Sequence, residues 1–413
     1  MKAKFLPYAF CILCLLPTAY CLSQGTWTQK ASLPTNAVKR AETGSFSING
    51  KGYVFGGSDV YPNWLSDCWE YDPILDSWAQ KASISLVGPR ESAFFTIGNL
   101  GYAATGFYGS GASSAVSKNF FVFDPAANTW TKKKDFGGTA RRDAVGFSIG
   151  TKGYVGTGAD AAGQTADLWE YDPSGDTWTK KSNFLGAARN AATSFAIGTK
   201  GYISLGRNGA TTFNDFWEYD PGAAAGGVWT QKANFPGVTR SESSSFVIGT
   251  VGYVGSGHNA AAPDFWAFDQ VANSWSAIAP LPGTVERNEA VGFAIGAKGY
   301  IAQGNVSGSG AQKDLWEYVP ATTGVDEVNN ALAFSVSPNP SAGKFQIIFE
   351  GGNYDYAMSV FSLQGEKVYT RNTQDGTALI DISSQPSGIY FIQVRSNDGR
   401  KTLEGIQKII VQR

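Results

Sequence analysis

Short stretches in which apolar and polar residues alternate recur along most of the chain. Aromatic or aliphatic residues at every second position, as in Phe46-Ser47-Ile48 and Trp69-Glu70-Tyr71, are typical of β-strands with one buried face. Gly, Asp-Pro and Asn/Asp-Thr clusters separate these stretches, and no segment has a convincing helical period. The pattern therefore predicts an all-β protein made of short strands.

The alternating stretches form a repeat. A Gly-Tyr pair occurs six times, and successive Tyr residues are 49, 52, 48, 51 and 47 positions apart. Each unit has Phe-x-Ile before this pair, a Gly four residues after the Tyr, an aromatic-x-aromatic segment and, in the first five units, a closing Trp. Four such segments predict a four-stranded sheet, and the small residues of the first segment place that strand innermost.

The sixth unit has no closing Trp of its own. The segment Thr26-Trp27-Thr28-Gln29-Lys30 matches the closing strand of the other units. We therefore expect the N-terminal strand to complete the last sheet, which would close the ring and cover exposed strand edges.

These units resemble kelch repeats. Residues Gly52 to Gly57 read Gly-Tyr-Val-Phe-Gly-Gly, and Trp-Glu-Tyr-Asp-Pro and a later Trp follow. The resemblance covers residues 26 to about 320 and implies a six-bladed β-propeller, to which we assign residues 24–320. Only Gly56-Gly57 has the complete double glycine of the family, so the shape of this turn in the other units is left open.

The chain changes character after the sixth unit. Residues 321–330 read as a linker, and residues 331–413 contain Val336-Ser337-Pro338-Asn339-Pro340 and a final strand ending at Arg413. This segment is similar to the C-terminal sorting domain of the type IX secretion system. The resemblance implies an immunoglobulin-like β-sandwich, interaction with the secretion machinery, and a protein that is released or anchored at the outer surface.

The N-terminus reads as a secretory signal peptide over residues 1–23. Lys2 and Lys4 precede an apolar run that is too short to span a bilayer, and small residues follow it. Its removal would leave Cys68 as the one cysteine, without an internal disulfide. We expect this signal peptide to direct the chain into the periplasm. The rest of the chain has no apolar stretch long enough to cross a membrane, so we expect no transmembrane segment.

Charge and composition exclude several functions. The 413 residues include 33 Lys and Arg against 34 Asp and Glu, and no long basic run is present, so nucleic acid is not an expected partner. A single histidine, His258, cannot supply a site that needs two or more imidazoles. We expect no metal and no cofactor, and a copper radical oxidase is excluded on the same ground.

Charged residues recur just before each innermost strand. Six residues before its Phe, five units have Arg, and the second has Pro89 followed by an Arg. These arginines are Arg40, Arg90, Arg141, Arg189, Arg240 and Arg287. Two residues later come acidic residues, with Ala191 as the exception. These are Glu42, Glu91, Asp143, Glu242 and Glu289.

Residues two apart share one face of a strand, so we expect a ring of guanidiniums beside a ring of carboxylates at the mouth of the channel. Two interpretations remain open. The charges either link neighbouring blades or bind a ligand.

The loop after each second strand should lie at the same mouth, and these loops differ between units. They contribute Tyr61, Trp64, Phe107, Tyr108, Arg207 and His258. Aromatic residues beside polar groups suit sugar rings or peptides, although Trp64 and Phe107 could instead pack against the blades. In five units an Asp stands two residues before the aromatic segment and reads as a turn cap rather than a calcium ligand; these residues are Asp67, Asp167, Asp215, Asp264 and Asp314.

The sequence thus favours a secreted or surface-displayed module that binds a glycan or a protein. The alternative is a carbohydrate-active enzyme, because sialic-acid mutarotases also resemble six-bladed kelch proteins and a carboxylate beside arginines can perform acid–base chemistry. Similar carboxylates in five units single out no catalytic residue. Ser-His-Asp catalysis is disfavoured because no nucleophile motif accompanies His258.

Overall fold

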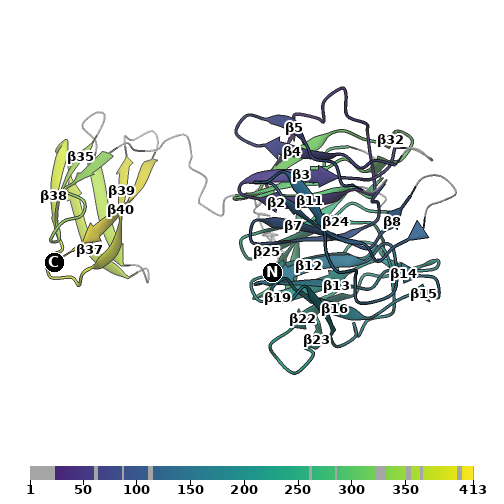
Figure 1. Ribbon diagram of the computed structural model, residues 1–413. Coiled ribbons are helices and arrows are strands. Elements are labelled where there is room, and N and C mark those ends of the chain that lie inside the picture. The colour runs from purple at the N-terminus through teal and green to yellow at the C-terminus, as the bar shows by residue number, and fades with distance from the viewer. Residues whose placement is uncertain are drawn as a thin grey trace, which may run out of the picture. The chain divides into compact units, whose positions relative to one another are not determined.

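The computed structural model describes residues 24–59, 64–85, 88–109, 115–259, 263–283, 286–321, 332, 334–349, 355–362, 366–397 and 402–412. The expected signal peptide, Tyr61 and nearly all of the expected linker lie outside these residues. The described chain contains strands and no helix, and it divides into two compact units between Ala321 and Thr322 (Figure 1).

In the described part of the chain, the first unit contains six four-stranded antiparallel sheets, the blades. The first blade consists of β2 (Gly44–Ile48), β3 (Lys51–Phe55), β4 (Cys68–Asp72) and β5 (Ser77–Lys81). The second consists of β6 (Ala93–Ile97), β7 (Leu100–Ala104), β10 (Phe120–Asp124) and β11 (Thr129–Lys132). The third consists of β12 (Val145–Ile149), β13 (Lys152–Gly156), β16 (Leu168–Asp172) and β17 (Thr177–Lys180).

The remaining blades have the same order of strands. The fourth consists of β18 (Thr193–Ile197), β19 (Lys200–Ser204), β22 (Phe216–Asp220) and β23 (Val228–Gln231). The fifth consists of β24 (Ser244–Ile248), β25 (Val251–Gly255), β26 (Phe265–Asp269) and β27 (Ser274–Ile278). The sixth consists of β29 (Val291–Ile295), β30 (Lys298–Ala302), β33 (Leu315–Val319) and the N-terminal β1 (Thr26–Lys30).

Each innermost strand contacts the innermost strands of the two neighbouring blades, and β2 contacts β29 to close the ring. The Gly-Tyr repeat fits this packing. A Cβ atom at Gly52 would lie 2.4 Å from the ring of Phe293, and one at Gly101 would lie 2.5 Å from the ring of Phe46. The glycine is thus required because the Phe of the preceding blade packs directly against it.

The N-terminal strand completes the last blade, as the sequence predicts. β1 pairs with β33, with Trp27 opposite Tyr318. The Nε1–H group of Trp27 donates a hydrogen bond to the carbonyl oxygen of Ala279, 2.8 Å away. The ring of Trp27 packs against Phe246 and Phe265 of the fifth blade. The six-bladed architecture and its closure are therefore confirmed.

Short strands follow the second strand of several blades. They are β8 (Phe107–Tyr108), β9 (Ala115–Val116), β14 (Ala159–Asp160), β15 (Gly163–Gln164), β20 (Arg207–Asn208), β21 (Thr211–Thr212), β31 (Asn305–Val306) and β32 (Gly310–Ala311). In the last blade, β28 (Arg287–Asn288) pairs with β31. Bridges such as Asn190 to Arg207 and Ser241 to His258 hold these loops beside the start of the innermost strands. This placement agrees with the sequence-based expectation.

The second unit is an immunoglobulin-like β-sandwich. One sheet contains β34 (Phe334–Ser337), β35 (Lys344–Phe349) and β38 (Thr377–Asp381). The other contains β36 (Asp355–Ser362), β37 (Lys367–Thr373), β39 (Gly388–Asn397) and β40 (Thr402–Val411). Buried residues from both sheets, including Ile347, Met358 and Ile392, form one core.

Candidate functional site

Six equivalent residues form a closed backbone ring at one end of the channel. This collar consists of Glu42, Glu91, Asp143, Ala191, Glu242 and Glu289. The N–H group of each residue donates a hydrogen bond to the carbonyl oxygen of the equivalent residue in the preceding blade, over 2.9–3.2 Å. All six have φ between 52° and 59°, the left-handed region that residues other than glycine rarely adopt.

This left-handed backbone interrupts the alternation of the strand, so residues two apart no longer share a face. The collar side chains line a cavity of about 200 Å³ that continues between the innermost strands. Five of its six members are acidic, and Ala191 leaves the fourth blade without a carboxylate. The expected ring of carboxylates is therefore present at the channel mouth.

The expected ring of guanidiniums is wrong. Five arginines point into their own blades instead and are 0–6% exposed; they are Arg40, Arg141, Arg189, Arg240 and Arg287. Each pairs with the Asp that precedes the aromatic segment of the same blade. These partners are Asp67, Asp167, Asp215, Asp264 and Asp314. The Arg–Asp pairs thus connect strands within a blade, so the expected links between neighbouring blades are also wrong for these five.

Each of these Asp residues also binds a Trp. Oδ2 of Asp67 accepts a hydrogen bond from Nε1–H of Trp69, 2.6 Å away, and Arg40 contacts both carboxylate oxygens at 2.8 Å. The same arrangement recurs in the other four blades. The Asp residues expected to cap turns therefore join an arginine to a tryptophan, and the Arg40 guanidinium holds the pKa of Asp67 below its usual value against the opposing effect of burial.

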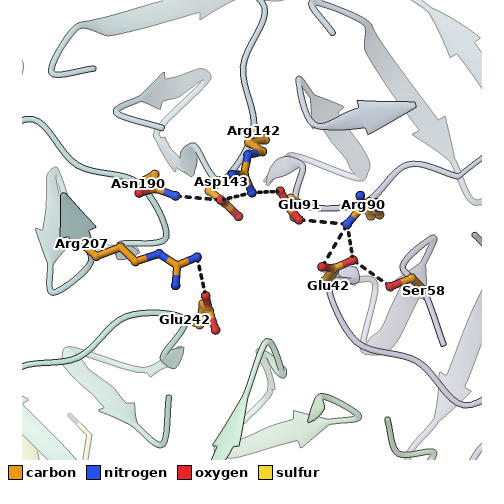
Figure 2. Close-up of polar contacts among 9 residues, drawn as sticks. All are labelled: Glu42, Ser58, Arg90, Glu91, Arg142, Asp143, Asn190, Arg207 and Glu242. Carbon is orange, nitrogen blue, oxygen red and sulfur yellow. Dashed lines mark hydrogen bonds and ion pairs between the residues drawn. The ribbon is translucent and has the colours of Figure 1, made fainter. Parts of the chain in front are cut away.

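The second blade lacks all three partners. Pro89, Asn119 and Phe121 occupy the positions of the Arg, the Asp and the Trp. Its arginine, Arg90, comes one residue later in the sequence and is directed to the collar rather than into the blade. Nη1 of Arg90 lies 2.9 Å from Glu42 and 3.0 Å from Glu91 (Figure 2). Arg90 is thus the one expected arginine of the ring that meets the carboxylates of the mouth.

A chain of ion pairs continues from Arg90 across blades one to four. Arg142 lies 3.2 Å from Glu91 and 3.4 Å from Asp143, and the side-chain amide of Asn190 donates to Asp143 (Figure 2). Sequence reasoning missed Arg142 and Asn190. Both stand directly before a collar residue, as Arg90 does, and this shared position could have identified them.

The opposite part of the collar carries less positive charge. Nη2 of Arg207 lies 3.0 Å from Glu242 (Figure 2), whereas within the described residues the carboxyl group of Glu289 has no hydrogen-bond or ion-pair partner. Burial, together with Glu42, Glu242 and Asp143, raises the pKa of Glu289 to about 8. Burial also raises the pKa values of Glu242 and Asp143, and burial with the nearby Asp143 and Glu42 raises that of Glu91 to about 9.

The aromatic loop residues behave differently from one another. The guanidinium of Arg90 lies over the rings of Trp64 and Phe107, 4.8 and 4.6 Å from their centroids. Tyr108 is only 7% exposed and packs near Phe121, so the expectation that it is presented to a ligand is wrong. The half-exposed His258 lies at the mouth, and its Nδ1 atom is 2.7 Å from Glu286.

Two further properties bear on the chemistry of the site. Among the described residues, no group of three His, Cys, Asp or Glu side chains is arranged to hold a metal ion. In the same part of the chain, no helix has the length and apolarity needed to cross a membrane.

Comparisons with known proteins match both units. The family model of the secretion system C-terminal sorting domain matches residues 335–412, and that of the Kelch motif matches residues 39–84. Beta-scruin of Limulus polyphemus is 29% identical over 113 residues, which are 26% of this chain and 12% of beta-scruin. This chain therefore spans a small part of that relative. The solved structure of YjhT has a TM-score of 0.59 and 14% identity over 69% of this chain and 96% of YjhT, a likeness of fold.

Proposed function

Because the chain is a secreted kelch β-propeller that carries a C-terminal sorting domain of the type IX secretion system, we propose that it acts at the cell surface or in the extracellular space as a binding protein. The ligand is a glycan or a protein, and it binds at the channel mouth.

The observation that carries this proposal is the concentration of polar groups at the collar. Five acidic side chains and three guanidiniums, those of Arg90, Arg142 and Arg207, meet beside a cavity of about 200 Å³. All six collar residues hold a backbone conformation that is costly for residues other than glycine, and such strain is concentrated at functional sites. Variable loops on a rigid scaffold commonly carry binding.

Arrays of glycans and of surface proteins, probed with the full mature chain, test this proposal. We expect at least one specific ligand, and we expect Arg207→Ala to change its affinity by tenfold or more, weakening a neutral or anionic ligand and strengthening a cationic one, because Arg207 reaches the collar. Arg371→Ala in the second unit is the matched control, since that guanidinium bonds only an exposed carbonyl among the contacts described, that of Leu379. A ligand bound equally by Arg207→Ala would place its site away from the mouth.

One observation favours a second function, the isomerisation or hydrolysis of a sugar. An acid–base catalyst works best when its pKa lies near the working pH, and Glu289 combines a pKa of about 8 with a carboxyl group that faces the cavity. Incubation of the full chain with free sugars, followed by NMR of anomer exchange and of released products, tests this function. Turnover that Glu289→Gln abolishes would support it, and turnover unaffected by this change would contradict it.

A further inference from the structure

At the seam between the first and the last blade, one carboxyl group has no hydrogen-bond or ion-pair partner among the described residues. Glu42 and Glu289 are neighbours in the collar, because the N–H group of Glu42 donates to the carbonyl oxygen of Glu289 over 3.2 Å. Glu42 is bonded to Arg90 and Ser58, whereas Glu289 has no such partner within the described residues. The side chain of Glu289 is thus available to a ligand that enters the cavity.

The same cavity is lined by a residue with a buried hydroxyl group. Thr43 follows Glu42 and lines the same cavity, and it is 5% exposed. Its Oγ1 atom is buried and has no hydrogen-bond partner among the described residues. A buried polar atom without a partner costs free energy, so an incoming donor would be favoured at this place.

The charges of the collar decide which donor fits. Five carboxyl groups face three guanidiniums, and each of the guanidiniums is already bonded to one or more of those carboxyl groups. An anionic ligand would find no guanidinium free of a carboxyl partner among these three, and it would meet an excess of negative charge once Glu289 and Glu91 ionise at their pKa values of about 8 and 9. A cationic ligand would balance that charge, and a primary ammonium group has three N–H donors for the acceptors at the seam.

We propose that the channel mouth binds a primary ammonium group, which the carboxylates of Glu289 and Glu42 and the hydroxyl group of Thr43 hold at the seam between the first and sixth blades. The proposal rests on the proposed binding function and names its ligand chemistry. A lysine side chain of a protein and an amino sugar of a glycan both present this group.

Binding of this kind should release a proton. The charged groups that face Glu289 are Glu42, Glu242, Asp143 and Arg207, and the three acids keep Glu289 protonated below a pKa of about 8. An ammonium ion favours the ionised carboxylate. Affinity should therefore rise with pH, by roughly tenfold per unit up to about pH 8, while the lysine amine stays charged up to its own pKa near 10.4.

Calorimetry of the full mature chain with two pairs of probes tests this proposal. The first pair is Nα-acetyl-lysine amide and the same compound acetylated at Nε; the second is a chitosan oligomer and the chitin oligomer of equal length. We expect the charged member of at least one pair to bind, and its acetylated counterpart to bind at least tenfold more weakly. The pair that responds identifies the source of the ammonium group.

Two variants test the assigned residues. Glu289→Gln should weaken binding by tenfold or more and remove the pH dependence, and Thr43→Val should weaken it severalfold with little change in shape. Asp135→Asn is the control for loss of one carboxylate, because Asp135 is half exposed and pairs with the exposed Lys132. Should Glu289→Gln fail to fold, Thr43→Val and the pH profile of the unmodified chain still decide the matter.

Equal binding of charged and acetylated probes, affinity for the lysine probe that falls as the pH rises from 6 to 8, or no binding of either ammonium probe between pH 6 and 9 would overturn the proposal. These failures are distinct from failure of the binding function. That function would survive if the arrays found a neutral or acidic ligand whose binding depends on Arg207, and it would fail if they found none.

Discussion

At the scale of single residues, the Arg–Asp pairs are a polar feature that recurs in five of the six blades. Arg240 is 1% exposed and touches Asp264, which in turn accepts from Trp266. Arg240→Ala would leave a partly buried carboxylate without its counter-ion, so we expect a loss of about 2–4 kcal/mol in the free energy of unfolding by urea. Arg207→Ala, at the mouth, should change it by less than about 1 kcal/mol. Equal effects of the two changes would contradict the structural role of the pairs.

The collar carboxyl groups make stability depend on pH. The pKa values of Glu91 and Glu289, about 9 and 8, lie above that of an exposed Glu, so the folded state binds protons that the unfolded state releases from about pH 4.5 upward. The stabilisation is complete below that pH and is lost as the pH rises through 8 and 9. We expect the melting temperature to fall from pH 5 to pH 9, and to fall less in Glu289→Gln. A melting temperature that rises over this range would contradict the raised pKa values.

The sequence could predict the positions of these charged residues but not their directions. The spacing of Glu42 and Arg40 is two residues, which in a regular strand means one shared face. The left-handed backbone at Glu42 turns the two side chains apart. The residue types near Glu42 do not predict that conformation. The pairing of Arg40 with Asp67 links residues 27 positions apart, and it becomes visible only when both are followed through the repeats. In the second blade the Arg, the Asp and the Trp are all replaced, and this joint replacement is the sign of the pairing in the sequence.

At the scale of strands, the repeat made the fold predictable. The four apolar segments of each unit and the displaced closing strand follow from the repeat pattern, so the sequence predicts both. The packing of each repeated Gly against the Phe of the preceding blade is seen only in the structure. The backbone conformation of the turn after each second strand is harder to predict from the sequence, because only the first unit has the double glycine. In the other units Thr105, Thr157, Leu205, Ser256 and Gln303 adopt φ between 51° and 63° at that position. Tertiary contacts, and not the residue type, therefore maintain the backbone conformation of this turn.

Strand β1 gives a prediction at this scale. Deletion of residues 24–32 removes the partner of β33 and the ring of Trp27 from the fifth and sixth blades. We expect aggregation or a large fall in melting temperature, because an unpaired edge is exposed and the ring is no longer closed. The control is a chain that keeps these residues and carries Gln29→Ala, which alters an exposed side chain of the same strand. A deleted chain that stays monomeric and melts like the complete one would contradict the closure.

At the scale of the whole molecule, the second unit is the part of the chain that matches a secretion signal. The sandwich has its own core and its own match to a sorting domain over residues 335–412. Removal of residues 331–413 should leave a folded propeller that stays in the periplasm, because the secretion machinery no longer recognises it. Cell fractionation with a periplasmic marker protein as the control measures this. Normal delivery of the shortened chain to the surface would contradict the assigned role.

The collar also bears on how such a protein could change its specificity. Its six hydrogen bonds join backbone atoms only, so the width of the aperture is set without any contribution from the side chains that surround it. Substitution there can alter the chemistry of the opening while its diameter stays fixed, as Ala191 already does among five acids. The left-handed backbone restricts the choice, because β-branched residues are strained in it. The opening thus behaves as a rigid frame whose inner lining can be replaced one blade at a time.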